Sequence, residues 1–375
     1  MKKQLFIMLL NTIILFGCAG ICLNFLPLIA PQAAAASVSL VSIASPEQRA
    51  KKPEISSDKT KPAEQTTNTR TDSAVMNVIG SKDSDDGYDI TKTPSDVQKL
   101  MQKAKGKYTK KNASGKTSEE PYQGGGTLIK HGNVQIQSKI PASFYKPDIK
   151  KLLAEGTDLR IKNREKPTIL IYHSHTSEAY ALADSGDYIG SDSSTSDKSR
   201  NVVRVGNELA ATLKKAGYNV IHDTATHDTK YNDSYNNSRK TVEKYLEKYP
   251  SIEITIDLHR DDITYSDKTK VKPTAVVNGK KAARMMIISG CEYGSVANFP
   301  DWEYNLRFNA AVMNQVNSMY PDLMRPILFA ERKYNMFETH TSFLLEVGTD
   351  ANTLDEACYS ARLFGTAFAK YLDTL

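Results

Sequence analysis

The chain has 375 residues, with 49 Lys or Arg against 43 Asp or Glu, which gives a formal net charge of +6 and a pI of about 8.8. This mild basic excess suits contact with an anionic wall or membrane, but no basic block with interleaved aromatic residues occurs in the globular part, so nucleic-acid binding has no support. The length admits two average domains, and composition is uneven along the chain.

Residues 1–31 predict a membrane anchor. Two lysines precede an apolar run from Leu5 to about Ala30, which is long enough to cross the hydrocarbon core of a bilayer as a helix. A cleavable signal peptide is the alternative, because small residues follow the run at 33–37. The flanking lysines place the N-terminus in the cytoplasm. We therefore expect a single-pass membrane protein whose globular part faces the wall or an intermembrane space, or a secreted protein if the segment is cleaved.

Residues 32–125 predict a disordered linker. They are rich in Lys, Ser, Thr, Asp and Pro and contain few large apolar residues, so they cannot bury enough surface to fold alone. One short helix over 96–105 is the only element expected there. The linker would let a surface-bound domain reach away from the membrane, although disorder without a function fits equally well.

Residues 126–375, with a core at 166–375, predict one globular domain in which short apolar runs alternate with segments of helical periodicity. Such alternation predicts an α/β fold, with a mostly parallel sheet and helices on both of its faces. Ligands bind such sheets beyond the carboxyl ends of the strands. The expected strands are 169–172, 218–221, 252–258, 283–289 and 343–347, and the expected helices are 201–216, 234–249, 304–320 and 353–372.

The four cysteines match neither a disulfide framework nor a cysteine zinc site. Cys18 and Cys22 fall inside the apolar N-terminal segment, which leaves Cys291 and Cys358. A disulfide between these two and a pair of buried free thiols are both compatible with the sequence.

Three of the expected strands end in residues that are costly to bury and useful for catalysis. His173, His175 and Glu178 follow the first strand, His259 ends the third and Glu346 lies in the last. A catalytic zinc site needs three His or carboxylate ligands and one open position for water, and a further carboxylate can take the proton of that water. The combination predicts a zinc hydrolase, whereas each histidine alone is more often structural.

Glu346 carries the most weight, because an acid that follows three apolar residues in a central strand is buried unless it faces a site. Arg260 and Asp261 follow His259, where they could position a substrate carboxylate, orient the histidine, or form a structural ion pair.

The remaining histidines are predicted to be solvated or at the surface. His222 and His227 lie in the loop after the second strand, where the alternative is that they border the site or touch substrate. His340 precedes the last strand, and His131 lies outside the alternating core.

The region from about residue 166 to 375 resembles the stage II sporulation protein P family, within the superfamily of zinc-dependent N-acetylmuramoyl-L-alanine amidases. The resemblance rests on four motifs, and the N-terminal anchor and polar linker are similar too. It implies a twisted mixed sheet flanked by helices. The motifs are I-L-I-Y-H-S-H-T-S-E-A-Y at 169–180, S-Y-N-N-S-R at 234–239, I-D-L-H-R-D at 256–261 and F-L-L-E-V-G at 343–348.

The resemblance also implies a Zn²⁺ ion held by His175, Glu178 and His259, with Glu346 as the general base. His173 is an alternative to His175, because residues two apart on a strand point the same way.

The carboxylate ligand is the point at which this chain departs from the wider superfamily. Amidases of the wider superfamily carry D-P-G-H-G where this chain has Y-H-S-H-T at 172–176, and their ligand carboxylate comes later, just before the first helix. Between Glu178 and Glu208 this chain has only aspartates, so Glu178 is the first choice and Asp197 is the fallback.

Proteins of this kind cleave the amide bond between N-acetylmuramic acid and the L-alanine of the stem peptide, and they are similar to enzymes that also cut peptide cross-links. The resemblance implies peptidoglycan as substrate, a role in septal wall remodelling and engulfment during sporulation, and two partners: stage II sporulation protein D, a lytic transglycosylase, and stage II sporulation protein M. The main competing hypothesis is a non-catalytic, membrane-anchored module that binds peptidoglycan. A glycosidase pair of Glu178 and Glu346 would leave the histidines without a task.

Overall fold

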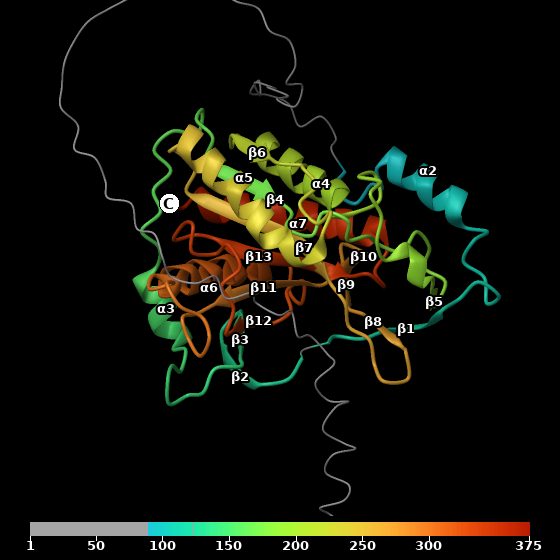
Figure 1. The fold of residues 1–375 in the computed structure, drawn as a ribbon, viewed down its shortest axis with the longest axis horizontal. Coiled ribbons are helices and arrows are strands. Elements are labelled where there is room, and N and C mark those ends of the chain that lie inside the picture. The colour runs from blue at the N-terminus through green and yellow to red at the C-terminus, as the bar shows by residue number, and fades with distance from the viewer. Residues whose placement is uncertain (1–88, 123) are drawn as a thin grey trace, which may run out of the picture. The chain divides into compact units, whose positions relative to one another are not determined.

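A computed structural model describes residues 89–122 and 124–375 (Figure 1). The predicted membrane anchor at 1–31 and the predicted linker as far as residue 88 lie outside these residues. Within the described part of the chain, no helix is long and apolar enough to cross a membrane.

The centre of the fold is an eight-stranded mixed sheet with the order β2-β3-β12-β11-β13-β7-β4-β6. β13, β7, β4 and β6 run parallel to one another, whereas β11 is antiparallel to β13 and starts a second parallel block with β12 and β3. The predicted mostly parallel mixed sheet is therefore confirmed. The strands are β2 (Thr127–His131), β3 (Val134–Ser138), β4 (Ile169–Tyr172), β6 (Val220–His222), β7 (Ile254–Asp261), β11 (Met285–Gly290), β12 (Ile327–Ala330) and β13 (Phe343–Thr349).

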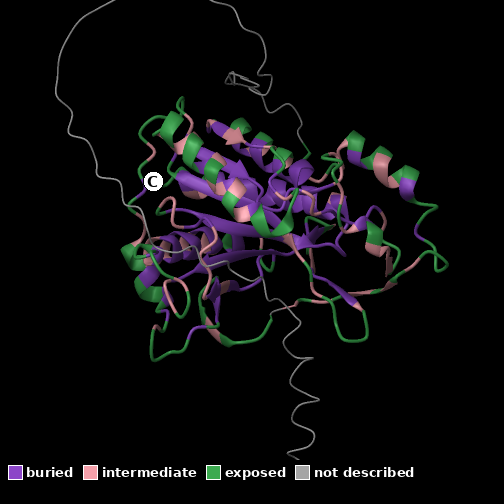
Figure 2. Cartoon of the chain, viewed as in Figure 1, coloured by how far each residue is buried: buried purple, intermediate pink, exposed green. Residues whose placement is uncertain are grey.

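Helices cover both faces of this sheet. On β4, Ile169 and Ile171 join the main apolar core, whereas Leu170 and Tyr172 pack on the opposite face with residues of α5 such as Val242. The central strands β4, β7, β11 and β13 and the helix α7 are mostly buried, while the outward sides of α4 and α5 carry exposed residues (Figure 2). The helices are α2 (Ser95–Ala104), α3 (Ile149–Glu155), α4 (Val202–Lys215), α5 (Ser234–Lys248), α6 (Trp302–Met319) and α7 (Leu354–Leu372).

The helix ends follow the sequence signals. The side chain of Asn201 accepts a hydrogen bond from the Val203 amide at the start of α4. Gly217, with a φ of 90°, ends the same helix in the left-handed region that favours glycine. At the start of α7, Thr353 and Glu356 form a reciprocal capping box. Local signals therefore set the boundaries of these two helices.

The prediction that the linker extends to residue 125 is wrong for its last part. Residues 89–122 form α2 and β1 (Gly115–Glu119), and they attach to the domain through buried apolar residues such as Val97 and through polar contacts. Arg204 binds Asp96 at 2.6 Å, and the hydroxyl of Tyr108 donates to Asp192 at 3.0 Å. A polar amino-acid composition does not reveal such long-range pairs. β1 pairs with β5 (Asp187–Tyr188) and β8 (Lys270–Lys272), and a separate hairpin joins β9 (Thr274–Val277) and β10 (Lys280–Ala283).

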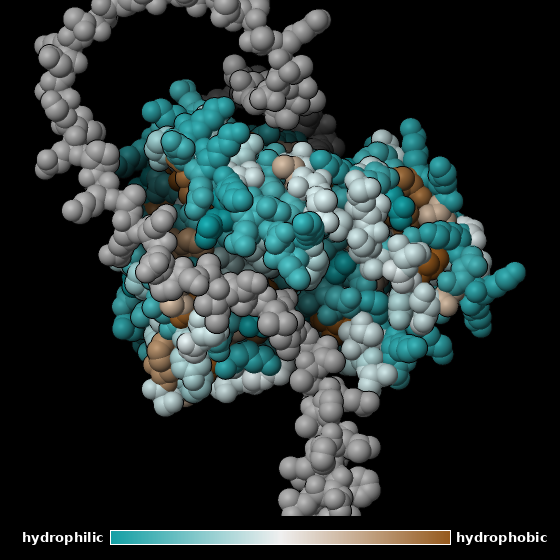
Figure 3. All heavy atoms as spheres, in the orientation of Figure 1, coloured by the Kyte–Doolittle hydropathy of each residue, from teal (hydrophilic) through white to brown (hydrophobic). Residues whose placement is uncertain are grey.

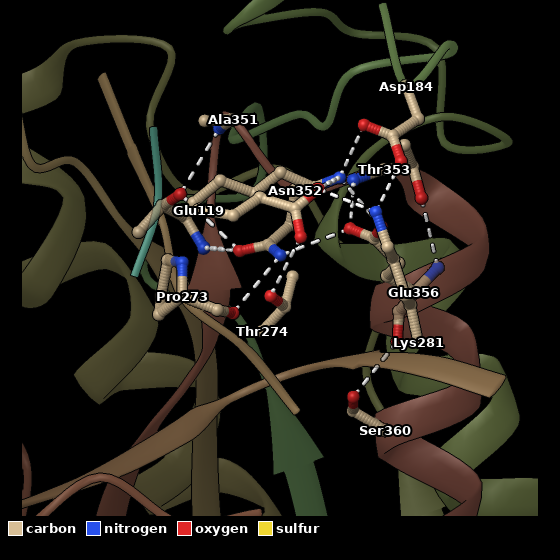
Figure 4. A network of polar contacts seen from close by, with 12 residues as sticks. Glu119, Asp184, Pro273, Thr274, Lys281, Ala351, Asn352, Thr353, Glu356 and Ser360 are labelled. Atoms are coloured by element: carbon tan, nitrogen blue, oxygen red, sulfur yellow. Dashed lines mark hydrogen bonds and ion pairs between the residues drawn. The ribbon is translucent and has the colours of Figure 1, made fainter. Parts of the chain in front are cut away.

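A buried lysine anchors β1 to the start of α7. Lys272 has no exposed surface, and its ammonium lies 2.7 Å from Asp184, 2.8 Å from Glu356 and 3.3 Å from Glu119. Lys281 reaches Glu119 and Asp184 from the more exposed side. Figure 4 shows these acidic side chains and Lys281 directed toward one another. One polar network therefore joins four segments that are distant in the sequence.

Cys291 and Cys358 are both buried and free. Of the two alternatives left open by the sequence, the pair of free thiols is the one that the structure adopts.

Candidate active site

The four residues expected at the site lie at the rim where β4, β7 and β13 end. These strands are neighbours and parallel, so their carboxyl ends meet (Figure 1). Glu346 on β13 is in register with His259 on β7, and Glu178 contacts His259. The ring of His175 lies 5.4 Å from the ring of His259, measured between centroids. The structure therefore brings together the residues that the sequence proposed.

Glu178 and His259 form the closest pair of the rim. Nδ1 of His259 lies 3.3 Å from Oε2 of Glu178, which also accepts a hydrogen bond from the Arg260 amide at 3.1 Å. Burial would raise the pKa of Glu178, but His259 and Arg260 outweigh it and lower that pKa to about 2. Glu178 is therefore a carboxylate at neutral pH, which is the form that binds a cation.

His175 lies in the turn after β4, buried among aromatic rings. It stacks on Tyr231 at 4.3 Å and meets Tyr235 edge-on at 5.3 Å. Its Nε2 is 3.4 Å from the hydroxyl of Ser234, whereas its Nδ1 is buried and has no hydrogen-bond partner in the part of the chain that the structure describes. A buried polar atom without a partner is unusual and marks a place where a ligand could bind.

Glu346 is 9% exposed, and its Oε2 is likewise buried and finds no partner among residues 89–122 and 124–375. Alternation along β13 puts it on the same sheet face as Leu344, which packs with Met286 and Ile288. Burial, and next the charge of Asp261, raise the pKa of Glu346 well above its ordinary value. A carboxylate whose pKa is raised is a stronger base than an ordinary one, which suits it to take a proton from water.

His173 does not belong to the rim. Its Nδ1 donates to the carbonyl of Leu258 at 2.8 Å, and its Nε2 lies 2.8 Å from Nε2 of His222. β4 ends at Tyr172, so His173 continues the alternation toward α4, where a Cβ on Gly206 would come within 2.9 Å of its ring. The turn that follows redirects His175. The expectation that residues two apart point the same way therefore does not hold here.

The fallback ligand and the two proposed substrate-binding residues also have other roles. Asp197 is exposed and closes a surface turn by accepting from Ser199. The guanidinium of Arg260 donates to the backbone carbonyls of Ala179 and Ser193. Asp261 pairs with Arg325 at 2.9 Å. Arg260 therefore holds the Glu178 segment, and Asp261 forms an ion pair.

Among the other histidines, the prediction of a solvated loop is wrong for His227. It is buried, its Nδ1 binds the carbonyl of His173, and its Nε2 binds Thr241. His227 therefore supports the turn that carries His175. His131 and His340 are exposed, as predicted.

The site has an aromatic wall that was not expected from the sequence. Tyr235 stacks on Tyr334 at 4.6 Å and lies parallel to the ring of His259 at 6.4 Å. Tyr334 has a φ of 43°, a strained conformation for a bulky residue. Tyr231 is 63% exposed. The face of the molecule shown in Figure 3 is mostly hydrophilic. The S-Y-N-N-S-R motif was a signal for Tyr235, but nothing in the sequence pointed to Tyr334.

The donor chemistry of the rim fits zinc. Two imidazoles and a carboxylate are common zinc ligands, and two ligands on a tetrahedral zinc lie about 3.3 Å apart when each bond is about 2.0–2.1 Å. The separation of His259 and Glu178 is 3.3 Å. Across residues 89–122 and 124–375, no group of three or more His, Cys, Asp or Glu is arranged as it stands to hold a metal ion. One pair is at ligand spacing, and His175 lies beside it as a candidate third donor.

The fold and the rim define the chain as an α/β protein with imidazoles and carboxylates gathered at the strand ends of a mostly parallel sheet. The family model described as stage II sporulation protein P matches residues 38–369, and the chain belongs to this family. A comparison with curated protein sequences gives no match.

Three similar solved structures are amidases. They are the N-acetylmuramoyl-L-alanine amidase AmiC2 of Nostoc punctiforme (TM-score 0.31, 11% identity, 55% of this chain and 96% of that chain), the CwlD amidase from Clostridioides difficile in complex with the GerS lipoprotein (TM-score 0.35, 12% identity, 56% and 100%), and the apo form of the amidase Ami1 from Mycobacterium abscessus (TM-score 0.32, 11% identity, 56% and 98%).

Proposed function

We propose that the chain is a zinc-dependent peptidoglycan hydrolase that cleaves the N-acetylmuramoyl-L-alanine amide bond. The observation that carries this proposal is the convergence of two imidazoles and two carboxylates at one rim. Two of their buried atoms, Nδ1 of His175 and Oε2 of Glu346, have no partner among the described residues. Membership of the stage II sporulation protein P family supports peptidoglycan as the substrate.

His175, Glu178 and His259 would hold the zinc ion. Zinc supplies Lewis acidity to the scissile carbonyl and lowers the pKa of the attacking water. Glu346 takes a proton from that water as its oxygen bonds to the carbonyl carbon, and returns a proton to the L-alanine nitrogen as the C–N bond breaks. Burial, which raises the pKa of Glu346, makes its carboxylate a stronger base and so favours the first of these transfers.

The wider parts of the proposal rest on the family resemblance. They are endopeptidase activity on cross-links, a role in septal wall remodelling and engulfment, and partnership with stage II sporulation proteins D and M. The N-terminal segment would anchor the chain with its catalytic domain outside the cytoplasm.

Digestion of purified sacculi by the full-length protein tests the activity. An amidase releases stem peptides with a free L-alanine amino group and leaves peptide-free glycan, and mass spectrometry identifies both products. New reducing glycan ends would instead indicate a glycosidase. An absence of cleavage together with substoichiometric zinc in the purified protein would favour the non-catalytic binding module.

A further inference from the structure

Asp257 lies just behind the rim, and the mechanism above gives it no role. It is 2% exposed and stands two residues before His259 on β7, so both side chains project from the same face of the sheet. A buried carboxylate is costly unless it is paired and hydrogen-bonded, so its contacts define what it does.

The first contact of Asp257 is with His259. Its Oδ1 lies 2.8 Å from Nε2 of the imidazole, while Nδ1 of the same ring faces Glu178 at 3.3 Å. The contact with Nε2 is electrostatic, because it lacks the direction of a hydrogen bond. Each ring nitrogen of His259 therefore faces a carboxylate, and this arrangement fixes which edge of the ring is turned toward Glu178.

The second contact is with the turn that carries His175. Asp257 accepts the amide of Ser174 at 2.8 Å and the hydroxyl of Ser174 at 2.5 Å, and Ser174 directly precedes His175. The hydroxyl of Ser174 also lies 2.8 Å from that of Ser238 on α5, which Asn335 binds at 2.9 Å. The carboxylate of Asp257 is thereby held in place from β4, α5 and the loop before β13.

We propose that Asp257 is a positioning residue that sets the spacing and ring orientation of His175 and His259, and that zinc affinity depends on it. The proposal rests on the proposed function, because it presupposes zinc at the rim. A carboxylate on the far nitrogen of a metal-binding imidazole orients the ring and raises its basicity, and loss of such a partner weakens metal affinity about 10- to 100-fold. Asp257 would act on both histidines at once.

Zinc affinity and stability of the full-length protein separate this role from a purely structural one. We expect Asp257→Asn to raise the dissociation constant for zinc about 10- to 100-fold, measured by competition with a chelator. Ser174→Ala removes one hydrogen bond to the carboxylate and should shift the constant in the same direction by less. The melting temperature of the metal-free protein is measured alongside for each variant.

Glu208→Gln is the matched control. Glu208 is a mostly buried carboxylate on α4 that binds Arg204 at 2.6 Å and Arg362 at 2.9 Å. Its replacement should lower the metal-free melting temperature and leave zinc affinity unchanged. If Asp257→Asn retains wild-type zinc affinity, Asp257 is only structural and the inference is overturned. If Asp257→Asn does not fold, the zinc affinity of Ser174→Ala tests the inference instead, and a wild-type affinity in that variant overturns it. A wild-type protein that binds no zinc overturns the proposed function, and the inference with it.

Discussion

Two buried polar clusters of the described fold differ in whether their atoms are paired. In the Lys272 cluster, an ammonium meets three carboxylates, and Glu356 also accepts from the Thr353 amide. None of the polar side-chain atoms of this cluster is buried without a partner within the described residues. At the rim, His175 and Glu346 each leave a buried atom unpartnered. Complete pairing indicates a structural network, whereas incomplete pairing at converging groups indicates a ligand site.

The largest expected effect comes from Glu346→Gln at the rim. Loss of the proton-transfer group should reduce hydrolysis of sacculi by about 10²- to 10⁴-fold. Zinc content and the melting temperature should stay close to wild type, because the amide keeps the shape of the carboxyl group. Product release is measured by mass spectrometry, and metal by elemental analysis. Undiminished cleavage would remove Glu346 from the mechanism.

In the Lys272 cluster we expect the opposite result. Lys272→Met leaves the buried Glu356 without its cation and Glu119 and Asp184 with Lys281 alone, and should lower the free energy of unfolding by about 3–5 kcal/mol. Hydrolysis per folded molecule should not change at temperatures below the transition. Lys281→Met is the control, because Lys281 pairs with the same Glu119 and Asp184 but is 46% exposed, and its loss should matter by about 0–1 kcal/mol. Equal losses measured by chemical denaturation would contradict a special role for the buried lysine.

A smaller effect is expected from Tyr108→Phe in the segment at 89–122. The hydroxyl of Tyr108 donates to Asp192 at 3.0 Å and accepts from the Leu182 amide at 2.8 Å, both in a buried environment. Removing it leaves buried groups unpaired and should lower the free energy of unfolding by about 1–3 kcal/mol. Thermal or chemical denaturation of the full-length variant measures this. A stability equal to wild type would mean that the segment only rests on the domain surface.

The rim and the segment at 89–122 were unequally predictable from the sequence. Glu346 and His259 could be found because they end apolar strands, and parallel strands bring their carboxyl ends to one edge. The attachment of residues 89–122 could not be found, because the Asp96–Arg204 pair joins positions 108 residues apart and leaves no local pattern. Asp257 carried a signal that was overlooked, since alternation places it beside His259 and it is an acid in an apolar strand.

Glu338 tests whether an unpartnered buried atom is by itself enough to mark a functional site. Its Oε1 is buried and has no partner within the described fold, but Glu338 belongs to the loop before β13 and not to the rim. Burial, and next the charge of Glu243, raise the pKa of Glu338 to about 7. Folding therefore favours the protonated form, so the stability that Glu338 contributes is complete below its ordinary pKa and is lost as the pH rises toward 7.

Glu338→Gln should consequently match the wild type near pH 4 and exceed its stability at pH 8, by on the order of 1 kcal/mol, because solvent screens a partly exposed carboxylate. Denaturation curves across this pH range measure the difference, and parallel curves for the two proteins would contradict it. Sacculus hydrolysis by Glu338→Gln should be unchanged, in contrast to Glu346→Gln. In that case a lone desolvated acid affects only stability, and the convergence of several such groups on one rim is what distinguishes the candidate active site.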